Sequence, residues 1–255
     1  MSTLNVNRIE SASGTAILVP AGYNLEVDGA ILNKDTLPPS PAGQSGKFLY
    51  TPDGSSLSWS VAGPKSIQQF TANGTWTKPA GISKILVMIQ GGGGAASGHA
   101  ESGGAGGYSE RLIDVTSVSS VQVTVGTGST SWTYYSGAAG GGNTSSFGSY
   151  MSATGGRGAN TTNQHCGGLP GLGSGGDINL YGGGGTGHMS WACAKGGSSF
   201  FGGAGVSGHP QGGNFINNNH QLASYGCGGT GGYTSYSNVV GAQGKNGVVI
   251  VYEYV

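Results

Sequence analysis

Charged residues are scarce in this chain of 255 residues, and the 10 Lys and Arg balance the 10 Asp and Glu to a formal net charge of zero. A balanced charge argues against nucleic acid or an anionic membrane surface as partner, because both are bound through clusters of Lys and Arg. The sequence has no run of about 18 apolar residues, and its start lacks the basic and apolar segments of a signal peptide. We therefore expect no membrane insertion and no secretory export.

Groups that carry catalysis or bind metal are also few. Between Val115 and Gly244 the only acidic residue is Asp177, whereas a glycosidase needs two neighbouring carboxylates, which only subunits sharing a site would supply. The sequence contains neither a Gly-x-Ser-x-Gly elbow nor a phosphate-loop spacing. Three cysteines exclude a complete intrachain disulfide framework, and the five histidines lack metal-binding spacings, although a trimer could bring equivalent histidines together on its axis. We expect no enzyme activity, no bound metal and no cofactor.

Glycine, by contrast, is abundant. Only nine of the 55 glycines lie outside Gly91–Gly247, and inside it they form runs such as Gly91–Gly94 and Gly182–Gly185. Such runs have no side chains to bury, so they are either disordered or packed backbone against backbone. Disorder usually accompanies high charge and few aromatics, and this region has neither property. We predict packed polyglycine II helices, extended with three residues per turn, which hydrogen-bond only to neighbouring chains.

Short strands frame the glycine region. Apolar, β-branched runs bounded by Gly or Pro predict strands at Lys84–Gln90 and Gly247–Val255. A further pair of strands is expected at Tyr108–Asp114 and Ser120–Val125. No segment predicts a helix. The expected fold class is therefore all-β with polyglycine II helices.

Composition divides the chain into three parts. Residues 1–37 predict short β segments with too little apolar material for a core of their own, which favours oligomerisation. Residues 38–65 combine a Pro- and Gly-rich linker with a small hairpin over 46–60, whose turn is Pro52-Asp53-Gly54. Residues 66–255 form the glycine-rich domain.

Several motifs resemble a known family. They are the segment Phe70–Gly81 with its Gly-x-Trp-x-Lys-Pro core, Val121–Gly126, Ser145–Gly148 and Gly244–Val251. Over residues 66–255 the chain resembles the Gly-rich C-terminal domains of tail-fibre and adhesin proteins of T4-like bacteriophages. The resemblance implies a virion protein of the tail fibre or tail tip, assembled in the host cytoplasm, in which loops on a rigid polyglycine II sandwich bind a host receptor.

The candidate receptor-binding residues lie in the patches between the glycine runs, since aromatic, Asn and Ser mixtures suit recognition loops. They are Trp132, Tyr134, Tyr135, His188, Trp191, Phe215, Asn218, His220, Tyr225, Tyr233 and Tyr236. The partners implied are a host surface polysaccharide or outer-membrane protein, other tail proteins and two further copies of the chain in a homotrimer.

Three alternatives stay open. Any one of these aromatic side chains could instead fold over the glycine scaffold and shield it. The protein could be a purely structural part of the virion. A Gly-rich polyproline II bundle could also serve as an ice-binding or matrix-like protein, although bulky patches break the regular period which that function needs.

Overall fold

The computed structural model describes residues 63–98, 101–130, 138–160, 166–187, 194–206, 223–232 and 241–255 in full, together with the backbone of four strands before them. The chain divides into two compact units, Met1–Gly63 and Pro64–Val255. In the first unit, antiparallel pairing joins β1 (Leu25–Val27) to β2 (Ala30–Leu32) and β3 (Lys47–Tyr50) to β4 (Ser58–Val61). The second pair is the hairpin expected around Pro52.

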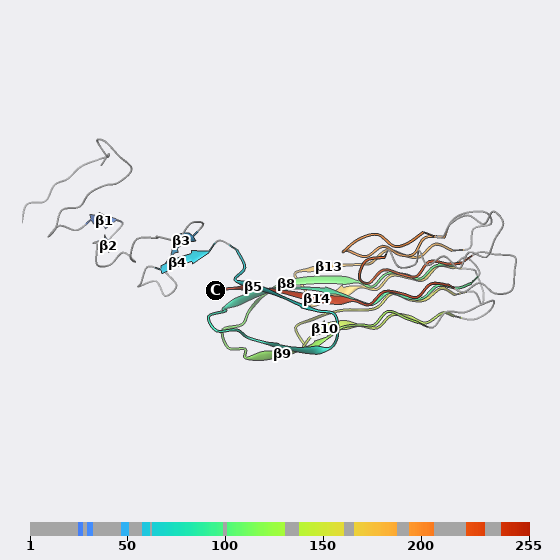
Figure 1. Ribbon diagram of the computed structural model, residues 1–255, viewed down its shortest axis with the longest axis horizontal. Coiled ribbons are helices and arrows are strands. Elements are labelled where there is room, and N and C mark those ends of the chain that lie inside the picture. Colours follow the sequence, from blue (N-terminus) through green and yellow to red (C-terminus); the bar gives the residue numbers. More distant parts are fainter. Residues whose placement is uncertain are drawn as a thin grey trace, which may run out of the picture. The chain divides into compact units, whose positions relative to one another are not determined.

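The second unit contains two antiparallel sheets of five strands each (Figure 1). One sheet has the strand order β13-β8-β7-β14-β5 and the other β12-β11-β10-β9-β6. The strands of the first are β5 (Ser66–Phe70), β7 (Lys84–Gln90), β8 (Tyr108–Asp114), β13 (Ile178–Leu180) and β14 (Val248–Tyr254). Those of the second are β6 (Gly74–Thr77), β9 (Ser120–Thr124), β10 (Ser145–Phe147), β11 (Met151–Ala153) and β12 (Gly173–Ser174). The expected all-β class is confirmed.

Side chains from both sheets form one hydrophobic core. Alternate residues of β7 and β14, such as Val87 and Val251, point into it, as the two-residue period of a strand requires. Trp76 and Phe147 of the opposite sheet are fully buried, with ring centroids 5.9 Å apart. The carboxylate of buried Glu253 accepts a hydrogen bond from Trp76 Nε1 at 2.8 Å, so the core also contains a polar link between the sheets.

The strands β8 and β9 lie where the sequence predicts them, and they belong to different sheets. β8 pairs with β7 and β13, whereas β9 pairs with β6 and β10 in the other sheet. β9 buries Val121 and Val123 in the shared core and β8 buries Ile113 there, so the two strands lie on opposite sides of it. The turn between them is fastened by Lys78, whose Nζ donates to the carbonyls of Val115 and Thr116 at 3.0 and 2.9 Å.

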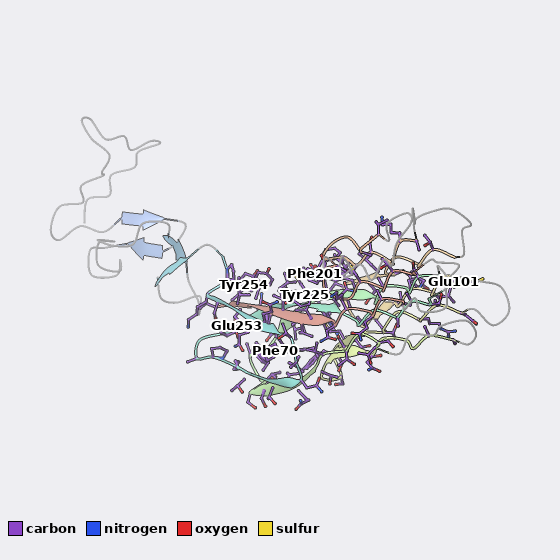
Figure 2. All side chains as sticks on the ribbon, turned by 45° about the vertical axis from the view of Figure 1, so that its right-hand side comes forward. Phe70, Glu101, Phe201, Tyr225, Glu253 and Tyr254 are labelled. Carbon is purple, nitrogen blue, oxygen red and sulfur yellow. The ribbon has the colours of Figure 1, made fainter. Side chains whose placement is uncertain are left out.

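Beyond the sheets the chain continues in extended rods, which run side by side away from the strand ends (Figure 1). We call these rods together the glycine bundle. The first rod, residues 91–98, follows β7, and the second rod, residues 101–107, leads into β8. The others are residues 126–130, 138–144, 154–160, 166–172, 181–187, 194–198, 202–206, 226–232 and 241–247. Glu101, which begins the second rod, lies at the end of the bundle away from the sheets (Figure 2).

Hydrogen bonds of the first rod repeat every third residue. Gly91, Gly94 and Ser97 donate to the second rod, Gly92 and Ala95 donate to rod 138–144, and Gly93 and Ala96 donate to rod 241–247, with N···O distances of 2.8–3.0 Å. A repeat of three is the one that a helix with three residues per turn and no internal hydrogen bonds gives. The elements of this unit are strands and turns, and polyglycine II for the rods stays a prediction with which this period agrees.

Two rods have hydrogen bonds to six neighbours each. Carbonyl groups of the first rod accept bonds from rods 126–130, 154–160 and 226–232, in addition to the three rods to which it donates. The second rod donates to 154–160, 181–187 and 226–232, and it accepts from the first rod, 166–172 and 194–198. The backbone of both rods is therefore bonded on all sides, as buried polar groups require.

This spacing explains the glycines. A Cβ atom added at Gly93 would overlap the carbonyl group of Cys227, and one at Gly244 would overlap the carbonyl group of Gly93. At Gly184 the nearest atom would lie 3.8 Å away. Glycine is thus a steric requirement inside the bundle and not on its surface.

Candidate functional site

Most of the candidate receptor-binding residues lie outside the described part of the chain. These residues are Trp132, Tyr134, Tyr135, His188, Trp191, Phe215, Asn218, His220, Tyr233 and Tyr236, and the five histidines of the sequence fall there too. Tyr225 is the one candidate within the described residues.

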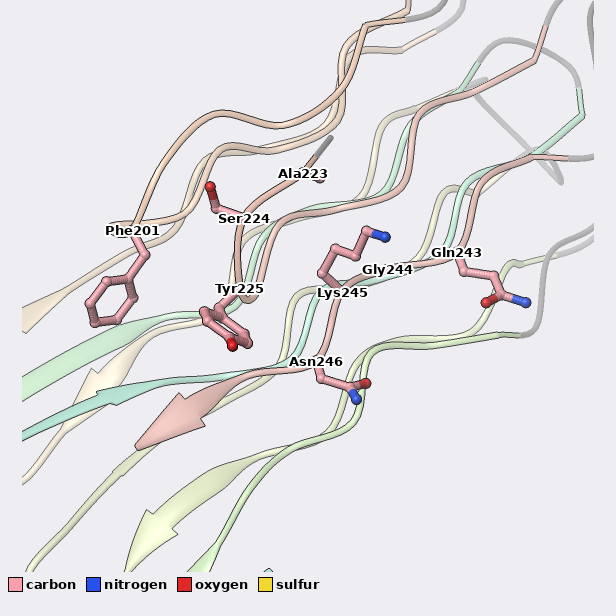
Figure 3. A pocket seen from close by; sticks show the side chains of 8 residues that line it. All are labelled: Phe201, Ala223, Ser224, Tyr225, Gln243, Gly244, Lys245 and Asn246. Carbon is pink, nitrogen blue, oxygen red and sulfur yellow. The ribbon is translucent and has the colours of Figure 1, made fainter. Parts of the chain in front are cut away.

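The described residues that flank these segments can nevertheless be placed. Ser97 N donates to Glu101 O, Gly232 N donates to Ser97 O, and Ala96 N donates to Ala242 O. Asn160 and Cys166 exchange two backbone hydrogen bonds of 3.1 Å. These flanks therefore lie at the end of the glycine bundle where Figure 2 labels Glu101, whereas Ala223, which follows segment 207–222, lies beside Tyr225 (Figure 3).

Tyr225 lies near the opposite end, where the rods meet the sheets (Figure 2). Its side chain is 40% exposed, and its hydroxyl accepts a weak hydrogen bond of 3.4 Å from Gln69 Nε2 on β5. The following Gly226 has φ of 71°, a left-handed conformation that glycine adopts without strain. A Cβ there would also approach Gly91 O to 2.5 Å. This tight turn fixes the direction in which Tyr225 leaves the bundle.

Tyr225 forms part of a hollow of about 710 Å³, which we call the side groove (Figure 3). The rings of Phe201 and Tyr225 lie at one end, and the side chains of Gln243, Lys245 and Asn246 follow along rod 241–247. Gln243 and Asn246 are exposed, whereas Lys245 is half-buried. The groove thus combines two aromatic rings, two amides and one ammonium group.

The backbone beneath the side groove is held firmly. Lys245 N donates to Cys227 O at 2.9 Å, and Lys245 O accepts from Gly93 N at 2.8 Å. Gly226 N donates to Asn246 O at 2.7 Å. The amide oxygen Oδ1 of Asn246 accepts a bond of 2.9 Å from Gly128 N, which leaves its amide nitrogen as a donor. The backbone that carries the lining side chains is therefore fixed by hydrogen bonds to the neighbouring rods.

An aromatic cluster supports Phe201. Phe200 stacks on Tyr108 with centroids 3.7 Å apart and rings inclined by 14°, and Phe201 meets Phe200 edge-on at 5.5 Å. Tyr108 is fully buried and its hydroxyl donates to the Glu110 carboxylate. Burial raises the pKa of Tyr108, and the hydrogen bond and charge of Glu110 raise it further. Tyr108 consequently stays neutral and acts as an anchor for Phe200 and Phe201.

A second, smaller hollow of about 440 Å³ lies at the far end of the bundle. Arg157, Asn160, Cys166 and Leu169 are among its lining residues. Leu169 is 61% exposed.

Of the candidate residues named from the sequence, Tyr225 lines the side groove, and its neighbours Phe201, Lys245 and Asn246 were not among the candidates. Their position beside Tyr225 depends on rods 226–232 and 241–247 being adjacent. Glycine runs contain no side-chain pattern from which the neighbouring rods could be predicted.

Within the described ranges, no group of three or more His, Cys, Asp or Glu side chains comes together as a metal site. Cys227 is buried, with its sulfur 3.4 Å from the carbonyl oxygen of Gly202. The same ranges contain no helix of the length and apolar character needed to cross a bilayer.

The chain was compared with known proteins. No curated protein matches it. A family described as "Glycine-rich domain" matches residues 68–254, which span both sheets and the whole glycine bundle. The protein therefore belongs to this glycine-rich domain family.

Proposed function

We propose that this protein is a bacteriophage tail-fibre or tail-tip component that recognises a host cell-surface receptor through segments displayed on a polyglycine scaffold. The observation that carries the proposal is the placement of the flanking residues. Ser97, Glu101, Asn160, Cys166, Gly232 and Ala242 lie at one end of the bundle. Segments 131–137, 161–165, 188–193 and 233–240 thus begin and end at a common face, whereas segment 207–222 ends at Ala223, which lines the side groove.

The packing of the bundle supports a rigid scaffold that carries separate recognition segments. Inside it, the backbone of the first and second rods is bonded to six neighbours each, and added side chains would overlap backbone atoms. The scaffold therefore tolerates little change. Loops that connect the rods can vary in sequence without changing the scaffold, because the rods supply the rigidity.

The proposed partners follow from the same scheme. The receptor is a surface polysaccharide or an outer-membrane protein, and the first unit joins three copies of the chain and attaches them to other tail proteins in the virion. Light scattering of the full-length protein at micromolar concentration tests the trimer, and a monomer would contradict it.

Binding of the purified protein to intact cells of candidate hosts tests the function. The informative variant replaces residues 209–220 with a Gly-Ser linker of equal length. This replacement leaves rod 226–232 and the side groove intact. We expect cell binding to fall at least about tenfold while the thermal unfolding midpoint stays unchanged, since contacts of this kind are concentrated in a few aromatic residues.

A matched control carries the same residues 209–220 in scrambled order, which keeps composition and length. Loss of binding in both variants assigns recognition to the order of residues in that segment. Wild-type binding in the linker variant, and in equivalent replacements of 131–137, 188–193 and 233–240, would refute recognition through these segments. A protein that binds no host at all would favour a purely structural role in the virion.

One observation favours a second candidate. The three-residue hydrogen-bond period is also what a polyproline II ice-binding bundle requires. Thermal hysteresis of the purified protein separates the two functions: appreciable activity supports ice binding, and its absence is expected of an adhesin.

A further inference from the structure

We propose that the side groove is a binding site for an acidic saccharide, in which Tyr225 supplies a stacking surface and Lys245 supplies the charge. The inference rests on the proposed function, since it names a ligand class for a receptor-binding protein. It concerns described residues outside the connecting segments: the groove lies where the bundle meets the sheets, and segment 207–222 ends at Ala223, which lines it (Figures 2 and 3).

The aromatic residues define one requirement on the ligand. Tyr225 is 40% exposed and shares the groove with Phe201, whose ring is fixed by Phe200 and Tyr108. Aromatic side chains provide a large apolar face at low entropic cost, and the Tyr hydroxyl adds a polar contact at its rim. A sugar ring, with C–H groups on its face and hydroxyls around it, matches both properties.

The polar residues define a second requirement. The groove has N–H donors on Gln243, Lys245 and Asn246, and no carboxylate lines it. Among the described residues, the Lys245 ammonium makes no hydrogen bond or ion pair, although its backbone is bonded on both sides. An excess of donors with one cation selects a ligand rich in acceptor oxygens and carrying negative charge. A carboxylate or phosphate group on a saccharide supplies both.

The number of charges argues against nucleic acid as the ligand. A nucleic acid is held by neutralising several successive phosphates, whereas Lys245 is the single cation among the groove's lining residues. One ammonium matches one acidic group per sugar repeat. The groove is also shallow enough that Gln243 and Asn246 remain exposed, so an internal stretch of a polysaccharide can lie along it.

Calorimetric titration of the full-length protein tests the assignment. The probes are an alginate tetrasaccharide, a phosphorylated mannose tetrasaccharide, uncharged cellotetraose and a short single-stranded oligonucleotide. We expect at least one acidic saccharide to bind roughly tenfold more tightly than cellotetraose, because a charge-assisted hydrogen bond is added to stacking. Its affinity should fall as salt is raised.

Two substitutions separate the contributions. Tyr225→Ala should weaken the acidic probe about tenfold by removing the stacking surface. Lys245→Gln should weaken it by a similar factor, abolish the salt dependence and leave cellotetraose unaffected. Matched controls are Tyr181→Ala and Lys195→Gln, since both residues are exposed, lie in the same unit and do not line the groove. The controls should bind as the wild type does.

Three results would overturn the assignment: no binding of either acidic saccharide, wild-type affinity in both groove variants, or tighter binding of the oligonucleotide. Lys245→Gln changes a half-buried side chain without touching the backbone bonds, so it remains informative even where Tyr225→Ala fails to fold. The experiments distinguish a failure of the saccharide-site proposal from a failure of the proposed function. Host-cell binding that depends on residues 209–220 while no saccharide binds would leave the function standing and remove the groove.

Discussion

The two halves of the second unit are stabilised in opposite ways. In the sheets, side chains such as Trp76 and Phe147 interdigitate, and stability comes from apolar area removed from water. In the glycine bundle the rods touch backbone to backbone, and stability comes from hydrogen bonds that repeat every third residue. The sheets therefore depend on side chains being present, and the bundle depends on side chains being absent.

The largest effect is expected from adding a side chain inside the bundle. Val in place of Gly93 would drive its Cβ into the carbonyl group of Cys227, in a rod with hydrogen-bonded neighbours on all sides. The rod that contains Cys227 cannot move aside without breaking its own hydrogen bonds. We expect Gly93→Val to lower the free energy of unfolding by more than about 5 kcal/mol, at the extreme of single substitutions, as measured by urea denaturation.

The matched control is Gly184→Val. A Cβ at Gly184 would lie 3.8 Å from its nearest neighbour, so the same substitution should change stability by less than about 1 kcal/mol. Equal effects at both positions would show that glycine matters here through backbone propensity and not through the closeness of the rods.

The next effect removes a side chain from the sheets. Phe147 is fully buried and tilted against Trp76. Phe147→Ala should cost about 3–5 kcal/mol, through lost apolar burial and the cavity left behind. Thermal unfolding monitored by Trp fluorescence measures it, since Trp76 reports on this core. A cost below about 1 kcal/mol would mean that the bundle, and not the core, determines the stability of the unit.

The same contrast explains what could be predicted from the sequence. The sequence predicts the strands Lys84–Gln90 and Tyr108–Asp114 with the bounds that the structure has. Lys84–Gln90 is an apolar run that ends at Gly91, a pattern that marks a strand. That β8 and β9 join different sheets could not be predicted, because alternation fixes which side chains are buried and does not fix which sheet a strand joins. The short strands β12 and β13 carry too few residues for any pattern.

In the bundle, composition predicted the kind of packing and nothing about neighbours. The rods share a high glycine content and no complementary side-chain pattern, so the sequence does not mark rod 226–232 as the partner of 241–247. For the same reason, Tyr225 could be proposed as a contact residue on chemical grounds, whereas its grouping with Lys245 and Asn246 required the fold.

A smaller effect is expected at the polar link within the core. Glu253 is buried, and its carboxylate accepts hydrogen bonds from Ser66 Oγ, from Gln68 Nε2 at 2.7 Å and from Trp76 Nε1 at 2.8 Å. Glu253→Gln keeps the shape but places an N–H group against these donors. We expect a loss of about 1–3 kcal/mol, the cost of leaving a buried polar group unsatisfied, as measured by urea denaturation.

Glu253→Gln has its control at Glu110, a half-buried carboxylate on β8 that accepts a bond from Tyr108. Glu110→Gln should cost less, since water can replace the lost contact. A larger loss at Glu110 than at Glu253 would show that the aromatic anchor beneath the side groove, and not the link between the sheets, is the more important polar contact of the sheet region.

The smallest expected effect is a loss of stability at acid pH, and it should arise in the sheets. Of the five acidic residues in the second unit, only Glu101 lies in the bundle. Asp114, at the end of β8, has its pKa lowered by the backbone hydrogen bond from Thr116 N and, next, by the bond from the Thr116 hydroxyl. A carboxyl group whose pKa is lower in the folded than in the unfolded state stabilises the fold above the unfolded pKa of about 3.9.

That stabilisation should disappear as pH falls from about 4 through the lower pKa of folded Asp114. Asp114→Asn should therefore reduce the difference between unfolding midpoints measured at neutral and at strongly acidic pH. Thr116→Val should reduce it less, since it removes the hydroxyl donor and keeps the backbone donor, which contributes most to the shift. If Thr116→Val has the larger effect, the hydroxyl and not the backbone amide holds the carboxylate. In either case the bundle, whose rods are joined by uncharged backbone groups, should give the same hydrogen-exchange protection pattern at both pH values once intrinsic rates are corrected.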